Sequence, residues 1–174
     1  GGVQDIERKM IRCVGEAKER FTEDALRIMR AIRFSAQLGY EIEENTKEAI
    51  CELAGNLAHI SAERIQTELV KLMISPHPEY LRTAYETGVT KVILPEFDAC
   101  METEQIHPHH SHSVGEHTLL ALTKVSAKKE LRLAILFHDI GKPTSMTIGE
   151  DGRTHFYGHE HLGAEMTKKI LRRL

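Results

Sequence analysis

The sequence contains no tryptophan, and Phe, Trp and Tyr together make up only 5% of its 174 residues. Its 3 cysteines are scattered and form no C-x-x-C pair, which predicts reduced thiols in a cytoplasmic protein and excludes a disulfide framework. No apolar run approaches the roughly 20 residues that a membrane-spanning helix needs. No basic segment followed by an apolar one forms an export leader, so we expect no membrane association.

An excess of charge of one sign is also lacking, since 23 Lys and Arg against 26 Asp and Glu give a formal net charge of -3. The chain as a whole therefore has no basic footprint for nucleic acid, and any RNA contact must come from a local patch. Histidine is the residue in excess. There are 11 in all, and most of them lie between His107 and His161.

Apolar periodicity predicts a mainly α protein. We expect Thr22 to cap the first long helix, which Gly39 ends, and Ser61 to cap the third. Asn45 or Thr46 is expected to cap the second. The predicted helices span residues 22–38, 45–55, 61–75, 78–87, 116–125, 130–139 and 159–174.

Two short segments favour β-structure. Residues 10–14 are predicted to form a short strand, and residues 145–156 alternate around a Gly-containing turn and so predict a small β-hairpin. The polar stretch after residue 95 is read as a linker over residues 96–112. These features divide the chain into a histidine-poor first half and a histidine-rich second half.

The stretch AILFHDIGK ends an apolar helix on His138 and Asp139. Alone, this is explained by a helix C-terminus, where histidine suits the negative dipole end and Gly141 is the capping residue. However, His117 is expected near the start of the preceding helix and His159 at the start of the last one. Imidazoles and a carboxylate at three helix ends can bind a divalent metal such as Mg, Mn or Ni.

The absence of a thiolate argues against a structural zinc site, and open positions on the metal would suit water and a phosphate. Lys142 is expected nearby as a compact positive charge for that phosphate. The other histidines of this half have simpler explanations, except that His110 is a further candidate for the site. We expect surface linker positions for His107, His109 and His112, and structural or solvated positions for His155 and His161.

The stretch EDALRIMR places Glu23, Arg27 and Arg30 on one helix face, with Asp24 three residues before Arg27. The simple explanation is a surface Glu–Arg pair at a helix start. A functional explanation is base selection. Cytosine and adenine present an amino donor beside a ring-nitrogen acceptor, which an Asp carboxylate and an Arg guanidinium would match, whereas uracil and guanine present the reverse pattern.

The sequence resembles two known protein families, one in its second half and one in its first half. HTLLAL, LFHDIGKP and GHEHLGAE resemble the HD superfamily of metal-dependent phosphohydrolases. The resemblance implies metal ligands at His117, His138 and Asp139, and a later Asp for which the chain offers no candidate; His159 is a further ligand candidate. EDALR resembles the nucleotide-selecting E-D-x-x-R motif of the tRNA nucleotidyltransferases and their poly(A) polymerase relatives. ISAERIQTELVKL resembles that family's neck helix, with Glu63, Arg64 and Glu68 in its signature.

The resemblance implies a helical neck or RNA-binding-like unit followed by an incomplete all-α HD domain. Residues 1–20 would end the catalytic head, 21–95 would form the neck, 96–112 a linker, and 113–174 an HD domain truncated at its C-terminus. The implied activity is addition of C and A nucleotides to tRNA 3′ ends, with ATP and CTP as substrates, tRNA as partner and a divalent metal at the HD site. Glu23, Asp24, Arg27 and the supporting Arg30 would bind the nucleotide.

The head's Gly-Ser turn and D-x-D carboxylate pair are not found in this sequence, so the chain alone is not expected to polymerise. Glu41 and Glu43 have the D-x-D spacing without that context, and are expected to cap the next helix. Two alternatives stay open: a free-standing HD phosphohydrolase acting on nucleotides or cyclic phosphates, and a non-catalytic helical RNA-binding module. The sequence leaves the added nucleotides, the natural metal and the oligomeric state open.

Overall fold

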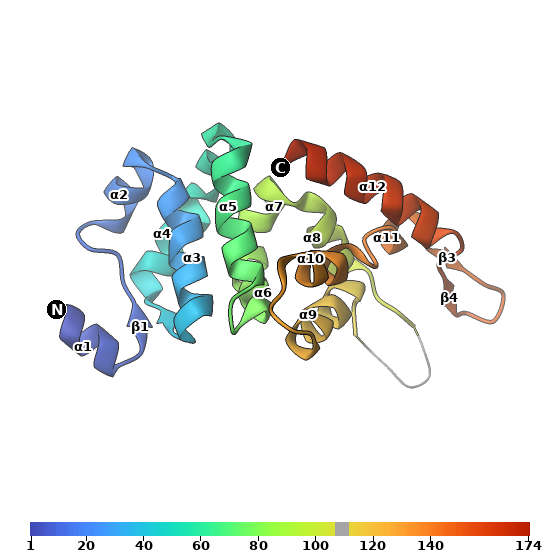
Figure 1. Ribbon diagram of the computed structural model, residues 1–174, viewed down its shortest axis with the longest axis horizontal. Helices are drawn as coiled ribbons and strands as arrows, with labels where there is room; N and C mark the ends of the chain where they lie inside the picture. The colour runs from blue at the N-terminus through green and yellow to red at the C-terminus, as the bar shows by residue number, and fades with distance from the viewer. Residues whose placement is uncertain (107–111) are drawn as a thin grey trace. The chain divides into compact units, whose positions relative to one another are not determined.

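The computed structural model describes residues 1–106 and 112–174, which form two compact units, residues 1–93 and 94–174. The described residues are mainly helical, as predicted, and their strands are two residues long. Within them, no helix has both the length and the apolar character needed to cross a bilayer. Figure 1 shows the helices along the chain.

The first unit is built around helix α3 and helix α5, which pack side by side (Figure 1). Both helices bury one apolar face, to which Ile28 and Ile32 of α3 and Leu69 and Leu72 of α5 belong. The elements of this unit are α1 (Gly2–Glu7), β1 (Met10–Ile11), α2 (Ala17–Glu23), α3 (Leu26–Leu38), β2 (Glu41–Ile42), α4 (Glu44–Leu53), the 3-10 helix η1 (Ala54–His59), α5 (Ala62–Met73), the 3-10 helix η2 (Pro78–Tyr80), α6 (Leu81–Glu86) and α7 (Val89–Ile93). β1 pairs in parallel with β2, with Met10 opposite Glu41.

The start of α3 differs from the prediction. Thr22 does not cap a helix but lies inside α2, where its hydroxyl donates to the carbonyl of Lys18 at 2.7 Å. The chain instead breaks at Asp24, whose backbone is extended, and the Asp24 carboxylate accepts from the amide of Leu26 at 3.1 Å. A short acidic side chain competes well for exposed backbone amides, which is why the break falls here. Gly39 ends α3 in a left-handed conformation, as predicted.

The cap of α4 is Glu43, and the expectation of Asn45 or Thr46 as the cap is wrong. The Glu43 carboxylate accepts hydrogen bonds from the amide and the hydroxyl of Thr46, each at 2.9 Å. Both Asn45 and Thr46 lie inside the helix. Glu43 therefore has the capping role predicted for it.

Glu68 of α5 is a buried carboxylate that pairs with arginines of α3. Its Oε2 accepts a short hydrogen bond from Nε of Arg33, and its Oε1 lies 3.6 Å from Nε of Arg30. Arg33 also donates to the side chain of Gln37 at 3.0 Å. Because a buried charge is costly without a partner, this cluster ties α5 to one position along α3.

We expect Glu68→Ala to lower the free energy of unfolding of the first unit by about 3 kcal/mol, because Arg33 loses the carboxylate that compensates its charge. Urea denaturation followed by circular dichroism measures the change. Glu63→Ala is the matched control, since Glu63 lies exposed on the same helix, and should cost only about 0.3 kcal/mol. Equal losses in the two variants would show that Glu68 does not hold the helices together.

The second unit consists of helices and one short β-hairpin, and it contains most of the histidines of the chain. Ser113 caps its second helix by accepting from the amide of Glu116 at 3.1 Å. The predicted hairpin is confirmed, with Thr147 opposite His155 and Ile148 opposite Thr154. The elements of this unit are α8 (Pro95–Glu102), α9 (Val114–Lys124), α10 (Lys129–Phe137), α11 (Lys142–Ser145), β3 (Thr147–Ile148), β4 (Thr154–His155) and α12 (His159–Arg173).

Helix α8 corrects the prediction of a linker over residues 96–112. Pro95 begins this helix, where its missing amide proton costs nothing. Phe97 and Cys100 are buried, and α8 packs against α9. Burial raises the pKa of the Cys100 thiol to about 12, which keeps it protonated and unreactive. The polar composition of the segment concealed this apolar face, and residues 107–111, with His107, His109 and His110, lie outside the described residues.

Candidate functional site

Helix ends bring the predicted histidines to Asp139. His117 lies in the first turns of α9, His138 and Asp139 directly follow α10, and His159 begins α12. Nε2 of His138 is 3.1 Å and Nε2 of His117 is 3.8 Å from Oδ2 of Asp139. Nε2 of His159 is 3.7 Å from Oδ1. The structure thus places these side chains, far apart in the sequence, around one buried carboxylate.

Backbone carbonyls orient the rings of His138 and His159. Nδ1 of His138 lies 2.6 Å from the carbonyl oxygen of Ile135, and Nδ1 of His159 lies 2.8 Å from that of Phe156. Each Nδ1–H therefore donates to the backbone, and each Nε2 is directed toward Asp139. With Nδ1–H fixed on the backbone, Nε2 is the nitrogen that can either share a proton with Asp139 or, in its neutral form, face a metal ion.

The electrostatic environment keeps Asp139 ionised. Burial by itself would raise the pKa of Asp139, but hydrogen bonds from His138 and Lys142 outweigh burial and bring the pKa to about 2. The same hydrogen bond raises the pKa of His138, against burial, which lowers it. A carboxylate that stays charged at neutral pH is the ligand form that a divalent ion requires.

The donor set fits a divalent metal ion. Among the described residues, His117, His138 and Asp139 each offer one ligand atom, and these atoms all lie within 4.8 Å of one another. Two imidazole nitrogens and one carboxylate oxygen suit borderline ions such as Mn, Fe, Co, Ni or Zn, and leave further coordination positions open. His159 stands at the edge of this set, where it could bind the ion or a ligand of the ion.

Lys142 also lies at this cluster, as predicted. Its Nζ is 3.0 Å from Oδ2 of Asp139 and 3.3 Å from Oε1 of Gln105. The ammonium lies 5.4 Å from the centre of the Phe156 ring. From the sequence, Lys142 was expected to face a phosphate. The pairing with Asp139 follows from the three-residue spacing across the turn.

Gly141 is required by packing, and it is not the residue that caps the preceding helix, since α10 ends at Phe137 and Gly141 comes directly before α11. Its φ of -83° is one that any residue adopts. A Cβ at Gly141 would lie 2.4 Å from the carbonyl oxygen of His159 and 2.6 Å from the amide nitrogen of Gly163. The backbone before α11 therefore touches α12, and this contact sets the position of His159 relative to Asp139.

We expect Gly141→Ala to destabilise the second unit by about 1–3 kcal/mol, because the added methyl group must push α11 away from α12. The displacement should also move His159 away from Asp139, so the histidine resonances should shift. Thermal unfolding and the NMR spectrum of the histidine rings measure the two effects. Gly55→Ala is the control, since nothing lies within 4 Å of a Cβ there. Unchanged stability and spectra in Gly141→Ala would contradict the packing argument.

A groove that the sequence did not predict borders the cluster of His117, His138 and Asp139. It has a volume of about 600 Å³ and runs between α10 and α12, with His138 at its edge. Periodicity shows which helices are amphipathic but not which faces leave space between them, so no sequence signal predicted it. The lining is mainly apolar and includes Leu133, Ala134, Phe137, Ala164 and Leu171.

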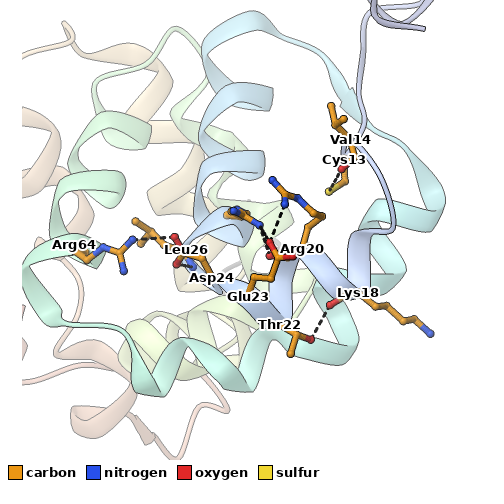
Figure 2. A network of polar contacts seen from close by, with 10 residues as sticks. Cys13, Val14, Lys18, Arg20, Thr22, Glu23, Asp24, Leu26 and Arg64 are labelled. Carbon is orange, nitrogen blue, oxygen red and sulfur yellow. Dashed lines mark hydrogen bonds and ion pairs between the residues drawn. The ribbon is translucent and has the colours of Figure 1, made fainter.

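In the first unit, EDALR spans the junction of α2 and α3. Figure 2 shows Glu23, Asp24 and Leu26 at this junction. Nη1 of Arg27 donates to Oε2 of Glu23 at 2.6 Å and to the carbonyl of Arg20 at 2.9 Å. Arg20 donates to the same Glu23 oxygen at 2.8 Å. The Arg27 guanidinium is therefore held by two acceptors on α2.

Asp24 has a different partner. Its Oδ2 accepts from Nη2 of Arg64 on α5 at 3.0 Å, and its Oδ1 accepts from the Leu26 amide (Figure 2). Burial would raise the pKa of Asp24, but these hydrogen bonds lower it, and the bond from Arg27 lowers the pKa of Glu23. Asp24 and Arg27 are thus not paired with each other, and each is oriented by another side chain.

The structure separates Arg30 from this pair and adds Arg64. Arg30 lies within ion-pair distance of Glu68, so its observed contact belongs to the α3–α5 cluster. Arg64 stands in the neck-helix signature, but its sequence position 40 residues from Asp24 gave no reason to join the two. A tertiary contact between helices was needed to show that Arg64 orients Asp24.

Known protein families match both halves of the chain. Residues 39–101 match the family described as the probable RNA and SrmB-binding site of polymerase A, and residues 107–174 match the HD domain family. The chain is 33% identical to the multifunctional CCA protein of Pasteurella multocida over 99% of its own length and 43% of that protein's. It is 35% identical to the A-adding tRNA nucleotidyltransferase of Deinococcus radiodurans, over 100% of its own length and 42% of that protein's.

A solved structure gives the same result. The crystal structure of the Bacillus stearothermophilus CCA-adding enzyme in complex with CTP matches 99% of this chain with a TM-score of 0.64 and 29% identity, and the match covers 39% of that chain. The chain thus spans less than half the length of the relatives it matches. Two family models match in succession and these relatives align along its whole length, so the chain consists of a region like the probable RNA-binding site of polymerase A followed by an HD domain, and it is similar to part of the tRNA nucleotidyltransferases.

Proposed function

We propose that this chain is the base-selecting and RNA-binding part of a bacterial, cytoplasmic tRNA nucleotidyltransferase that adds C or A nucleotides to tRNA 3′ ends. Its substrates are ATP and CTP, and its macromolecular partner is tRNA. The observation that carries the proposal is the junction of α2 and α3, where Asp24 and Arg27 are close in sequence and separately oriented. Glu23 and Arg64 are the residues that orient them.

Selection would work by matching hydrogen-bond patterns. The Asp24 carboxylate accepts a hydrogen bond from the exocyclic amino group of cytosine or adenine, and the Arg27 guanidinium donates to the adjacent ring nitrogen. Uracil and guanine would place an oxygen against the carboxylate and an N–H against the guanidinium. Those charged groups would then be left unpaired, which is the costly outcome that rejects the wrong base.

The names of the relatives support the substrate class. The Pasteurella multocida protein is named a multifunctional CCA protein and the Deinococcus radiodurans protein an A-adding enzyme. The Bacillus stearothermophilus enzyme was solved with CTP. Since these relatives cover both bases that one carboxylate–guanidinium pair would select, a shared selection site for C and A accounts for them.

The test is extension of a tRNA that lacks its 3′-terminal nucleotides, with labelled ATP and CTP. A full-length protein carrying this chain should extend it. The 174-residue chain should not, because its sequence holds no D-x-D carboxylate pair in a Gly-Ser context to bind two catalytic metals. Extension by the chain alone, or none by the full-length protein, would overturn the proposal.

A second function is supported by the cluster of His117, His138 and Asp139. We infer a metal-dependent phosphohydrolase site for nucleotides or cyclic phosphates in the second unit. A bound divalent ion would supply a water of lowered pKa for attack on phosphorus. His138 and Asp139 would hold the ion, Lys142 would face the phosphate, and the neighbouring groove offers room for the rest of the substrate.

Metal content of the purified chain and hydrolysis of a 2′,3′-cyclic nucleotide test this second function. Bound Mn or Ni and turnover that stops on addition of a chelator would support it. A chain that binds no divalent metal from a millimolar solution would exclude it, and would leave the base-selecting function of the first unit untouched.

A further inference from the structure

The Lys142 ammonium stands where a metal ion would be attracted. Its Nζ lies 3.0 Å from Oδ2 of Asp139, the same oxygen that faces His138 at 3.1 Å and His117 at 3.8 Å. The Lys142 side chain is only 16% exposed, and Gln105 accepts from it at 3.3 Å on another side. The ammonium is therefore held next to the candidate ligand oxygen and is largely shielded from solvent.

This placement has an electrostatic consequence. Asp139 is buried, so its negative charge needs a cation nearby, and Lys142 supplies one without any metal. A divalent ion bound between His138 and Asp139 would lie close to the same ammonium. Two cations sharing one carboxylate in a partly buried site repel each other strongly, because screening by water is weak there.

A phosphate group reverses the sign of that effect. A phosphate oxygen bound to the metal brings negative charge between the ion and Lys142, and the ammonium can then donate to the phosphate in place of Asp139. Repulsion between two cations becomes attraction of both to one anion. Gln105 provides an acceptor that can retain part of the ammonium's hydrogen bonding during this change.

We propose that Lys142 is a built-in counter-ion that weakens metal binding at Asp139 in the absence of phosphate and makes metal and phosphate bind cooperatively. The inference rests on the proposed metal site of the second unit and deepens it. By thermodynamic reciprocity, phosphate must tighten the metal by the same factor by which the metal tightens phosphate. The site would then hold its metal firmly only when a phosphorylated substrate is present.

The test is Mn²⁺ titration of the chain by calorimetry, with and without methylphosphonate, a phosphate analogue that has no phosphoester bond to hydrolyse. In the wild type, saturating methylphosphonate should tighten Mn²⁺ binding about tenfold, within the range typical of coupled sites. Lys142→Gln keeps a donor for Asp139 without the charge. It should bind Mn²⁺ about tenfold more tightly than wild type when no phosphonate is present, and should show less tightening on its addition, because only coordination of the phosphonate to the ion then couples the two.

Lys168→Gln is the matched control, since it removes the same charge from an exposed position on α12 where Lys168 pairs only with Glu165 among the contacts described. It should behave as wild type. Lys142→Arg retains the charge and should retain the coupling. The wild-type titration involves no mutation, so its result cannot be caused by misfolding of a variant. A wild-type Mn²⁺ affinity that is unchanged by methylphosphonate overturns the inference.

Other outcomes separate this inference from the metal site itself. Equal Mn²⁺ affinities of wild type and Lys142→Gln, or the same gain in Lys168→Gln, would overturn the role of Lys142 while leaving the metal site in place. Absence of Mn²⁺ binding by every variant, with and without methylphosphonate, would overturn the metal site and this inference together.

Discussion

Asp139→Asn will abolish metal binding by the second unit. The neutral amide replaces the only carboxylate among the candidate ligands His117, His138 and Asp139. Mutation of residues that hydrogen-bond to metal ligands, without contacting the ion, typically lowers metal affinity about 10–100-fold. Removal of the charged ligand itself should therefore weaken Mn²⁺ or Ni²⁺ binding by more than about 100-fold. Calorimetric titration with each ion measures this directly, and hydrolysis of a 2′,3′-cyclic nucleotide should stop in the same variant.

Asp151→Asn is the matched control for that experiment. Asp151 is an exposed carboxylate in the hairpin turn, where it accepts from the amide of Arg153 at 3.0 Å. It should bind metal as wild type does. Asparagine at position 139 still offers an oxygen to Lys142, so we expect the helices to stay folded, and a thermal melt checks this. Wild-type metal affinity in Asp139→Asn would show that the histidines and Asp139 are not a metal site.

Arg27→Ala will remove most of the discrimination between cytosine or adenine and uracil or guanine. The variant loses the guanidinium that donates to the ring nitrogen, and Glu23 keeps only Arg20 as its ion-pair partner among the contacts described. Hydrogen bonds to charged groups contribute about 1.5–3 kcal/mol, so the ratio of CTP to UTP incorporation should fall about 10–100-fold. Single-turnover extension of tRNA by the full-length protein measures that ratio.

Two further variants make the Arg27 result specific. Arg64→Ala should lower selectivity less than Arg27→Ala, because Asp24 keeps its hydrogen bond from the Leu26 amide and loses only one of its two partners. Arg172→Ala removes an exposed arginine of α12 and should leave selectivity unchanged. If Arg27→Ala selects bases as well as wild type does, the start of α3 has only a structural role.

Local patterns in the sequence predicted most of the helices, and the reason is that amphipathic periodicity is a property of each segment by itself. The helix boundaries were less well predicted. Thr22 was predicted to cap the first long helix, and only the extended backbone at Asp24 shows that the chain breaks between α2 and α3 two residues later. Helix α8 was missed because its apolar face is short and lies in a polar segment, so its burial against α9 decided its structure.

Residue types alone identified the candidate sites of this chain: a carboxylate and a guanidinium at the start of α3, and histidines with an adjacent Asp at the ends of later helices. Those residue types are recognisable because hydrogen-bonding pattern and ligand preference belong to single side chains. The side chains that orient them are recognised only from the folded chain. Arg64 reaches Asp24 from another helix, and Gly141 brings α12 against α11 so that His159 meets Asp139. Contacts between elements distant in sequence depend on how the helices pack, and no segment contains that information alone.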